Sequence, residues 1–195
     1  MNKREKSIFD VGESLLAERL LGNIEAIEKA YQESPEDYLV PFSEAIETLL
    51  KRVAAAQTQA DKGSLRYICF SFLQSSLYTG NDQIRIDAYD ERGFSDLTDT
   101  HVYWSPNFIF QYAHDDMVYF REHIKKHILR IWDYEIMTFF ARYVHHYFHI
   151  IKDILPDLLS ATVPPSILGT QALTVTFGGY MDQIVVIFET EQVEQ

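Results

Sequence analysis

Residues 64–92 read SLRYICFSFLQSSLYTGNDQIRIDAYDER, and this stretch decides the fold class. Its first half is rich in aromatic and β-branched side chains, which favour strands. Its second half alternates Ile84, Ile86 and Ala88 with polar side chains, which is the period of a strand with one buried face. The TGND between the two halves supplies turn residues. The stretch therefore predicts a β-hairpin.

Two amphipathic helices are expected before this hairpin, over residues 1–63. Apolar side chains recur every three or four positions over residues 7–31, which is the spacing of one helical face. Pro35 disfavours helix in the residue before it and separates this helix from a second one that starts at Pro41. The second apolar stripe fades toward Gly63, a common helix stop. The N-terminal third therefore predicts a helical hairpin.

Residues 105–155 are expected to be helical, as one long helix or as two. Ser105 and Pro106 match an N-cap followed by a first-turn proline. Residues 117–151 contain no Gly or Pro and would make a helix roughly 50 Å long. A compact domain of this size is only about 40 Å across, so a straight helix would protrude. We therefore expect a bend near Asp133, which is the best N-cap for a second half.

A second β-hairpin is expected at residues 170–191, where two strand-like runs flank GGYMD. Residues 156–165 contain three prolines and predict an irregular connection before it. The sequence as a whole predicts an α+β fold, with a helical hairpin and a long helix packed on a small antiparallel sheet of two β-hairpins. Length and the absence of repeats predict a single domain over residues 1–195.

The charge of the chain is acidic and unevenly distributed. The formal net charge is −12, and residues 156–195 contain five acidic residues and no Lys or Arg. Nucleic-acid binding depends on clustered Lys and Arg, so direct binding of DNA or RNA is not expected. An acidic surface favours association with a partner that has a basic surface.

The chain has one cysteine, Cys69, so no intramolecular disulfide can form and a reducing compartment, the cytoplasm, is expected. Its place between Ile68 and Phe70 predicts a buried, unreactive thiol. No stretch approaches the ~18 apolar residues of a membrane span, and the first residues lack the apolar run of a signal peptide. No membrane association is expected.

Histidines are the conspicuous candidates for metal chemistry. His123 and His127 stand four apart, as do His145 and His149, and this spacing puts each pair on one side of a helix. The same pattern is typical of the solvated face of an amphipathic helix. Only a chain reversal near Asp133 would bring both pairs into one site.

A second candidate is the HDD sequence at residues 114–116, because adjacent imidazole and carboxylate groups suit a divalent ion that activates water. It resembles the His-Asp pair of metal-dependent phosphohydrolases, which are built from helices, whereas this chain predicts two β-hairpins. The hypothesis of a metal-dependent hydrolase takes its ligands from the following set: His101, His114, Asp115, His123 and His127.

The favoured hypothesis is a non-catalytic intracellular protein that binds a macromolecular partner through an acidic, aromatic-rich surface, as an inhibitor or immunity-type protein does. The chain contains no phosphate-binding loop, GxSxG or HExxH motif, and no cofactor is expected unless the hydrolase hypothesis holds. A structural or assembly subunit is the third alternative. The candidate surface residues lie around the HDD sequence: Tyr103, Trp104, Tyr112, Asp116 and Tyr119.

Overall fold

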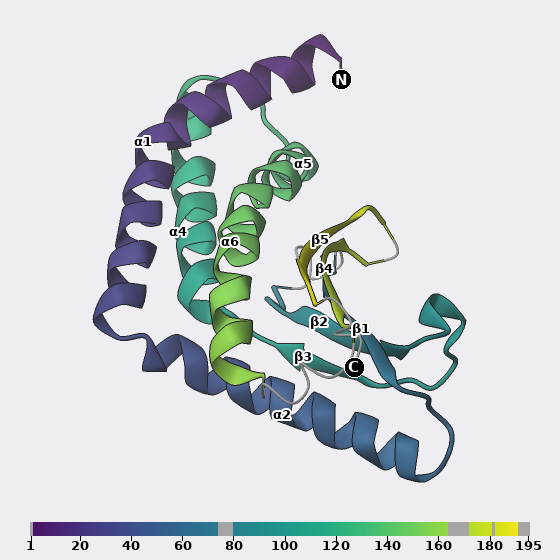
Figure 1. Cartoon of the computed structure of the whole chain (residues 1–195). Helices are drawn as coiled ribbons and strands as arrows, with labels where there is room; N and C mark the ends of the chain where they lie inside the picture. Colours follow the sequence, from purple (N-terminus) through teal and green to yellow (C-terminus); the bar gives the residue numbers. More distant parts are fainter. Residues whose placement is uncertain (1, 74–79, 164–171, 181, 191–195) are drawn as a thin grey trace. The chain divides into compact units, whose positions relative to one another are not determined.

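The computed structural model describes residues 2–73, 80–163, 172–180 and 182–190, and these form an α+β fold (Figure 1). The helices are α1 (Lys3–Glu33), α2 (Glu36–Thr58), α4 (Asn107–His123), α5 (Asp133–Tyr143) and α6 (His145–Thr162). The strands are β1 (Leu65–Phe72), β2 (Ile84–Asp90), β3 (His101–Trp104), β4 (Thr174–Gly179) and β5 (Ile184–Glu189). No described helix combines the length and the apolar character that crossing a membrane requires.

The chain divides into two compact units, and each is described by itself. The helical unit comprises residues 1–35 and 107–151, and the sheet unit comprises residues 36–106 and 152–195. The expectation of a single domain over the whole chain stays a prediction.

In the helical unit, α1 packs against α4 and α5. Gly12 of α1 permits the close approach of α1 to α5, since a Cβ atom at this position would lie 2.4 Å from the ring of Phe139 on α5. The Phe139 ring also stacks on Phe120 of α4, with 4.3 Å between ring centroids. Aromatic stacking therefore ties the three helices together.

In the sheet unit, the described strands form a five-stranded sheet in the order β3-β2-β1-β4-β5. The central strand β1 runs antiparallel to β2 and parallel to β4. Helix α2 covers β2 and β3 (Figure 1). Its Phe42 stacks on Phe70 at 5.9 Å and meets Trp104 edge-on at 5.0 Å. This face of the sheet carries the hydrophobic core.

The hairpins predicted at residues 64–92 and 170–191 are confirmed where the chain is described, but the sheet is more than two hairpins. Residues 101–104 lie between the predicted elements and form β3 on the outer side of β2. The parallel pairing of β1 with β4 was also not predicted. A strand of four residues is too short for its alternation to stand out, and parallel pairing over a long connection leaves no local signal.

The predicted bend near Asp133 is confirmed, with one correction to the cap. The chain leaves the helix after His123, and Arg130 adopts a left-handed conformation with φ 53°. Trp132, not Asp133, is the N-cap of α5, and its backbone N–H donates to Glu135 Oε2 at 2.9 Å. A reciprocal bond from the third helical residue stabilises the helix start.

Two prolines expected at helix boundaries lie inside helices. Helix α2 begins at Glu36, five positions before Pro41, and α6 continues past Pro156 to Thr162. A proline removes one backbone hydrogen bond, and burial of neighbouring apolar side chains offsets that loss. These neighbours are Tyr38, Phe42, Leu155, Leu158 and Leu159. Residues 164–171 of the predicted connection lie outside the described residues.

The two N-terminal helices are confirmed, and each packs within its own unit. Helix α1 has its partners in the helical unit, and α2 has its partners on the sheet.

Candidate functional site

One face of the sheet, opposite the core, brings polar and aromatic side chains into a row. Side chains of paired residues point to the same side of a sheet. The register places one side chain from each strand in line: His101, Asp87, Cys69, Thr176 and Val186. We call this surface the site face. It is defined by these five residues together with Tyr67, Arg85, Tyr89, Tyr103 and Ile184.

A groove runs over the site face. It consists of two adjoining hollows of about 580 and 310 Å³, both lined by Tyr89, Phe94 and Ile184. The larger hollow is lined by charged side chains, among them Arg85 and Asp87, together with apolar ones such as Leu97. The smaller hollow is lined mainly by aromatic and aliphatic side chains. The groove therefore offers an apolar compartment beside a charged one, which suits recognition of an amphipathic ligand.

An ion network occupies the charged compartment. Arg85 donates to Asp87 from Nε and Nη2 at 2.7 to 2.9 Å and to Asp99 from Nη2 at 3.3 Å. Asp99 also bonds His101 Nδ1 at 2.7 Å, and this bond holds the pKa of Asp99 below its ordinary value. The bonds that Arg85 donates to Asp87 raise the pKa of Arg85, which therefore stays charged.

The same network provides a partial set of metal ligands. One ligand atom each from Asp87, Asp99 and His101 lies within 4.8 Å of the other two, and among the described residues this is the one such set. Two carboxylates and an imidazole suit a divalent transition metal. However, the Arg85 guanidinium already neutralises both carboxylates, and a cation bound there would face its charge. The geometry therefore favours an internal ion network over a metal centre.

A loop beside the groove exposes two large apolar side chains. Phe94 is 73% exposed and Leu97 is 92% exposed. Gly93 has φ +58°, a left-handed conformation that favours glycine, and it turns the loop at this point. The Phe94 ring meets the Tyr89 ring edge-on at 5.3 Å. Phe94 is therefore seated against the site face while most of its surface remains open to solvent.

Buried charges anchor this loop. Lys62 Nζ pairs with Asp96, and both side chains are fully buried. Arg92 bonds Asp90 at 2.6 to 3.0 Å and Asp96 at 3.2 Å. Bonds from Arg92 lower the pKa of Asp90. Burial alone would raise the pKa of Asp96. Bonds from Lys62 and from the backbone N–H groups of Thr98 and Asp90 outweigh this effect and lower the pKa of Asp96. Both carboxylates are therefore ionised and hold the loop in one conformation.

Burial controls the reactivity of two groups on the site face. It raises the pKa of the Cys69 thiol and raises the pKa of Tyr89 to about 12. We expect Cys69 in the folded protein to react with iodoacetamide more than about tenfold more slowly than in protein unfolded in urea, because the reactive species is the thiolate. Mass spectrometry of the labelled peptide measures both rates, and equal rates would show that the thiol is accessible.

The predicted metal ligands are divided between the two units. His101 belongs to the sheet unit, and the other four candidates belong to the helical unit. Within the described parts of the chain, His114, Asp115, His123 and His127 form no group of three possible ligands. His123 instead bonds the carbonyl of Tyr119 through Nδ1 at 2.8 Å.

The candidate surface residues lie in different environments. Tyr103 is 44% exposed and belongs to the site face, whereas Tyr112 and Tyr119 are half-buried in α4. Trp104 and Asp116 are buried, which corrects their assignment to a surface. Trp104 fills the core under α2, and Asp116 is the acceptor of a buried hydrogen-bond network.

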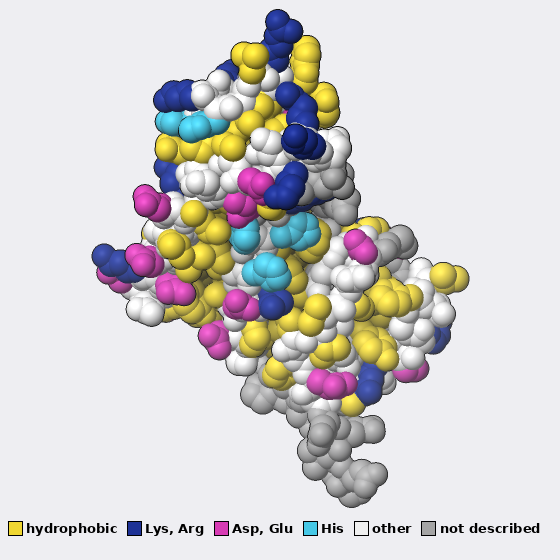
Figure 2. Space-filling view, turned by 90° about the horizontal axis from the view of Figure 1, so that it is seen from above, with side chains coloured by type: hydrophobic (Ala, Val, Ile, Leu, Met, Phe, Trp, Pro, Cys, Tyr) yellow, Lys and Arg dark blue, Asp and Glu magenta, His cyan; other side chains and the backbone are white. Residues whose placement is uncertain are grey.

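The histidines of α6 lie near one another without forming a metal site. Burial lowers the pKa of His145, and the neighbouring His149 and His146 lower it further. His146 Nε2 lies 3.7 Å from Glu13 Oε1. Figure 2 shows several histidine side chains among acidic, basic and hydrophobic ones on the face drawn. Their setting fits the polar side of a helix.

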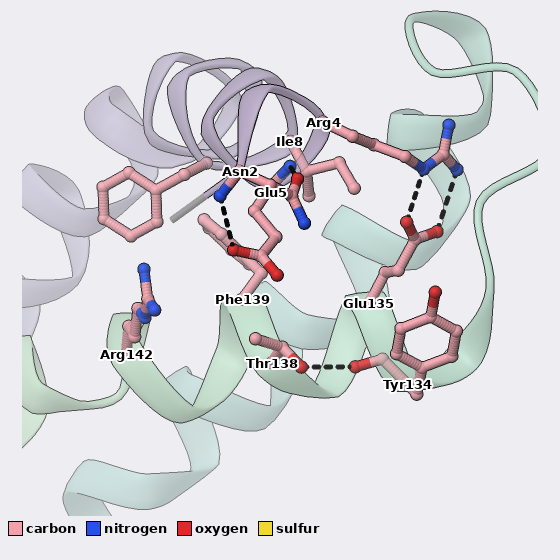
Figure 3. A pocket seen from close by; sticks show the side chains of 10 residues that line it. Asn2, Arg4, Glu5, Ile8, Tyr134, Glu135, Thr138, Phe139 and Arg142 are labelled. Atoms are coloured by element: carbon pink, nitrogen blue, oxygen red, sulfur yellow. Dashed lines mark hydrogen bonds and ion pairs between the residues drawn. The ribbon is translucent and has the colours of Figure 1, made fainter.

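The helical unit contains a small cavity of about 110 Å³ between α1 and α5. Figure 3 shows Arg4 and Glu135 facing each other on one side of it and Arg142 on the other. Arg4 donates to Glu135 from Nε at 2.5 Å and from Nη2 at 2.9 Å, and these bonds lower the pKa of Glu135. The cavity has room for only a few water molecules. It is therefore a weaker candidate than the groove.

The comparisons with known proteins add no assignment. No protein-family model, curated protein or solved structure matches the chain. A function is therefore inferred from the site face.

Sequence reasoning predicted His101 and Tyr103 of this site and missed its other components, including Asp87, Asp99, Phe94 and Leu97. The polar phase of QIRIDAY was a usable signal, because it places Arg85, Asp87 and Tyr89 together on one side of a strand. The exposure of Phe94 and Leu97 left no signal, since their loop is fixed by residues distant in sequence, including Lys62.

Proposed function

We propose that this chain is a non-catalytic protein that binds a protein partner with a basic surface through the site face and the adjoining loop. The observation that supports it best is the exposure of Phe94 and Leu97 on a loop held by the buried Lys62–Asp96 pair. The proposal places this binding in the cytoplasm, in line with the single buried Cys69.

A fixed loop with exposed apolar side chains is suited to association. Burying Lys62 and Asp96 costs several kcal/mol of desolvation per ion, which their attraction offsets. The resulting rigidity lowers the entropy lost on binding, because the loop is already ordered. Large side chains in such positions are where binding energy concentrates. Phe94 and Leu97 are therefore the expected anchors.

Charge supports a basic partner. The groove is lined by the exposed Asp182 in addition to Asp87 and Asp99, which are paired internally with Arg85. The whole chain carries a formal net charge of −12. Acidic surfaces steer encounters with basic proteins and disfavour acidic ones. An inhibitor or immunity-type protein directed at a basic partner fits this surface.

Peptides selected on the purified chain from a displayed random library test the proposal. We expect selected peptides to bind at least about tenfold more weakly to the double variant Phe94→Ser, Leu97→Ser, because each anchor contributes about 1 kcal/mol or more. Isothermal titration calorimetry measures the affinities. The matched control is Leu129→Ser, which changes another exposed leucine (83%) in the helical unit. Equal affinity for the double variant, or an equal loss in the control, would contradict the proposal.

A further inference from the structure

Strand β5 forms one edge of the sheet. Among the described strands it pairs with β4 alone. Ile184, Val185 and Val186 are 41%, 57% and 55% exposed, so apolar side chains project from both faces of this edge. An edge strand of this kind presents unpaired backbone groups to another extended chain.

The usual protection of an edge strand is weak here. Proteins discourage pairing at an edge with Lys, Pro or a bulge. The sequence of β5, IVVIFE, contains neither Lys nor Pro. The register shift leaves Ile187 without a partner on β4, since Thr176 pairs with Val186 and Val175 pairs with Phe188. The regular part, Ile184–Val186, therefore remains available.

Close packing fixes the position of β5. A Cβ atom at Gly178 would lie 2.2 Å from the carbonyl oxygen of Gln183, so only glycine permits β4 and β5 to approach as they do. The edge is therefore presented in a defined position next to the groove, where Ile184 and Val186 line the hollow of about 310 Å³.

We infer that β5 receives an extended segment of the partner as a sixth strand, with alternate side chains of that segment entering the groove. This inference rests on the proposed function and specifies how the same site recognises its partner. Backbone hydrogen bonds along the edge supply affinity, and the groove selects the side chains on one face. The regular part of β5, Ile184–Val186, spans about 10 Å, so regular pairing involves about three residues of the segment.

Charge defines the composition of this segment. Asp182 precedes β5, Glu189 ends it, and residues 156–195 contain no Lys or Arg. Acidic groups at both ends and apolar side chains between them complement a segment with Lys or Arg at its ends and aliphatic residues in alternation. The occupant is therefore a basic, strand-forming segment of a protein.

A seven-residue fluorescent peptide that alternates Lys with Val is the direct probe, measured by fluorescence anisotropy with the full chain. We expect saturable binding that weakens about tenfold or more in Val186→Lys, since an added edge lysine repels the peptide. The matched control Val186→Thr keeps the β-branched shape and should bind within about twofold of the original. The same peptide with alternate backbone nitrogens methylated should not bind, and neither should a peptide that alternates Glu with Val.

Three outcomes would overturn the inference. The first is equal binding of the methylated peptide, which cannot form the ladder of backbone hydrogen bonds. The second is a dimer of the wild-type chain in light scattering that Val186→Lys converts to monomer, which would assign the edge to self-association. The third is that library-selected peptides lose affinity with the Phe94 and Leu97 double variant but not with Val186→Lys. That result would reject strand addition and leave the proposed function in place.

Discussion

Replacing Asp116 with alanine is expected to lower the free energy of unfolding of the helical unit by about 3 to 4 kcal/mol. Asp116 is fully buried and accepts hydrogen bonds from Arg19 Nε at 2.8 Å and Asn23 Nδ2 at 3.0 Å. It also accepts from the hydroxyls of Tyr143 at 2.7 Å and Tyr147 at 2.5 Å. Alanine would leave the buried hydroxyls of Tyr143 and Tyr147 without this acceptor, and Arg19 without its ion-pair partner.

The two tyrosines are hydrogen-bond donors in the neutral pH range. Burial and the bond to Asp116 raise the pKa of Tyr143 and of Tyr147, so both hydroxyls keep their protons. The loss expected in Asp116→Ala is therefore nearly independent of pH in the neutral range.

Hydrogen exchange in a series of urea concentrations measures this change in the peptides of α4, α5 and α6, which contain Asp116, Tyr143 and Tyr147 respectively. The adjacent Asp115 is exposed, so Asp115→Ala is a matched control that should change the free energy of unfolding by less than about 0.5 kcal/mol. Equal effects of the two substitutions would show that the network does not stabilise the unit.

The hairpin at residues 64–92 could be predicted because its signal is local. The alternation of Ile84, Ile86 and Ala88 with polar residues predicts which side of the strand is buried. The helix break near Asp133 could also be predicted, because a straight helix over this segment would be longer than the expected diameter of the domain. Both predictions depend on residues close together in the sequence.

The candidate site was harder to predict from the sequence because it is formed by contacts between residues far apart in the chain. The row of side chains on the site face requires the parallel pairing of β1 with β4, which joins residues about one hundred positions apart. The sequence predicted a metal site from histidine spacing, yet His123 and His127 belong to the helical unit and His101 to the sheet unit. Asp116 was selected for its neighbours His114 and Asp115, although its structural role comes from α1 and α6.

Replacing Lys62 with methionine is expected to lower the free energy of unfolding of the sheet unit by about 3 kcal/mol. Methionine keeps most of the volume but removes the charge, which leaves the fully buried Asp96 carboxylate without its main partner. Arg92 Nη2, at 3.2 Å from Asp96, offsets only part of the loss because it also holds Asp90. Hydrogen exchange of the β2 peptides in a series of urea concentrations measures the change in the free energy of unfolding.

The double variant Lys62→Met, Asp96→Asn separates an unpaired charge from lost packing. It removes both charges, so we expect it to recover about half of the stability lost in Lys62→Met alone. The single variant Lys62→Met should also bind library-selected peptides with lower affinity, because a mobile loop no longer presents Phe94 and Leu97 in a fixed position. A single variant that loses stability but keeps full peptide affinity would show that the ion pair stabilises the sheet without ordering the loop for binding.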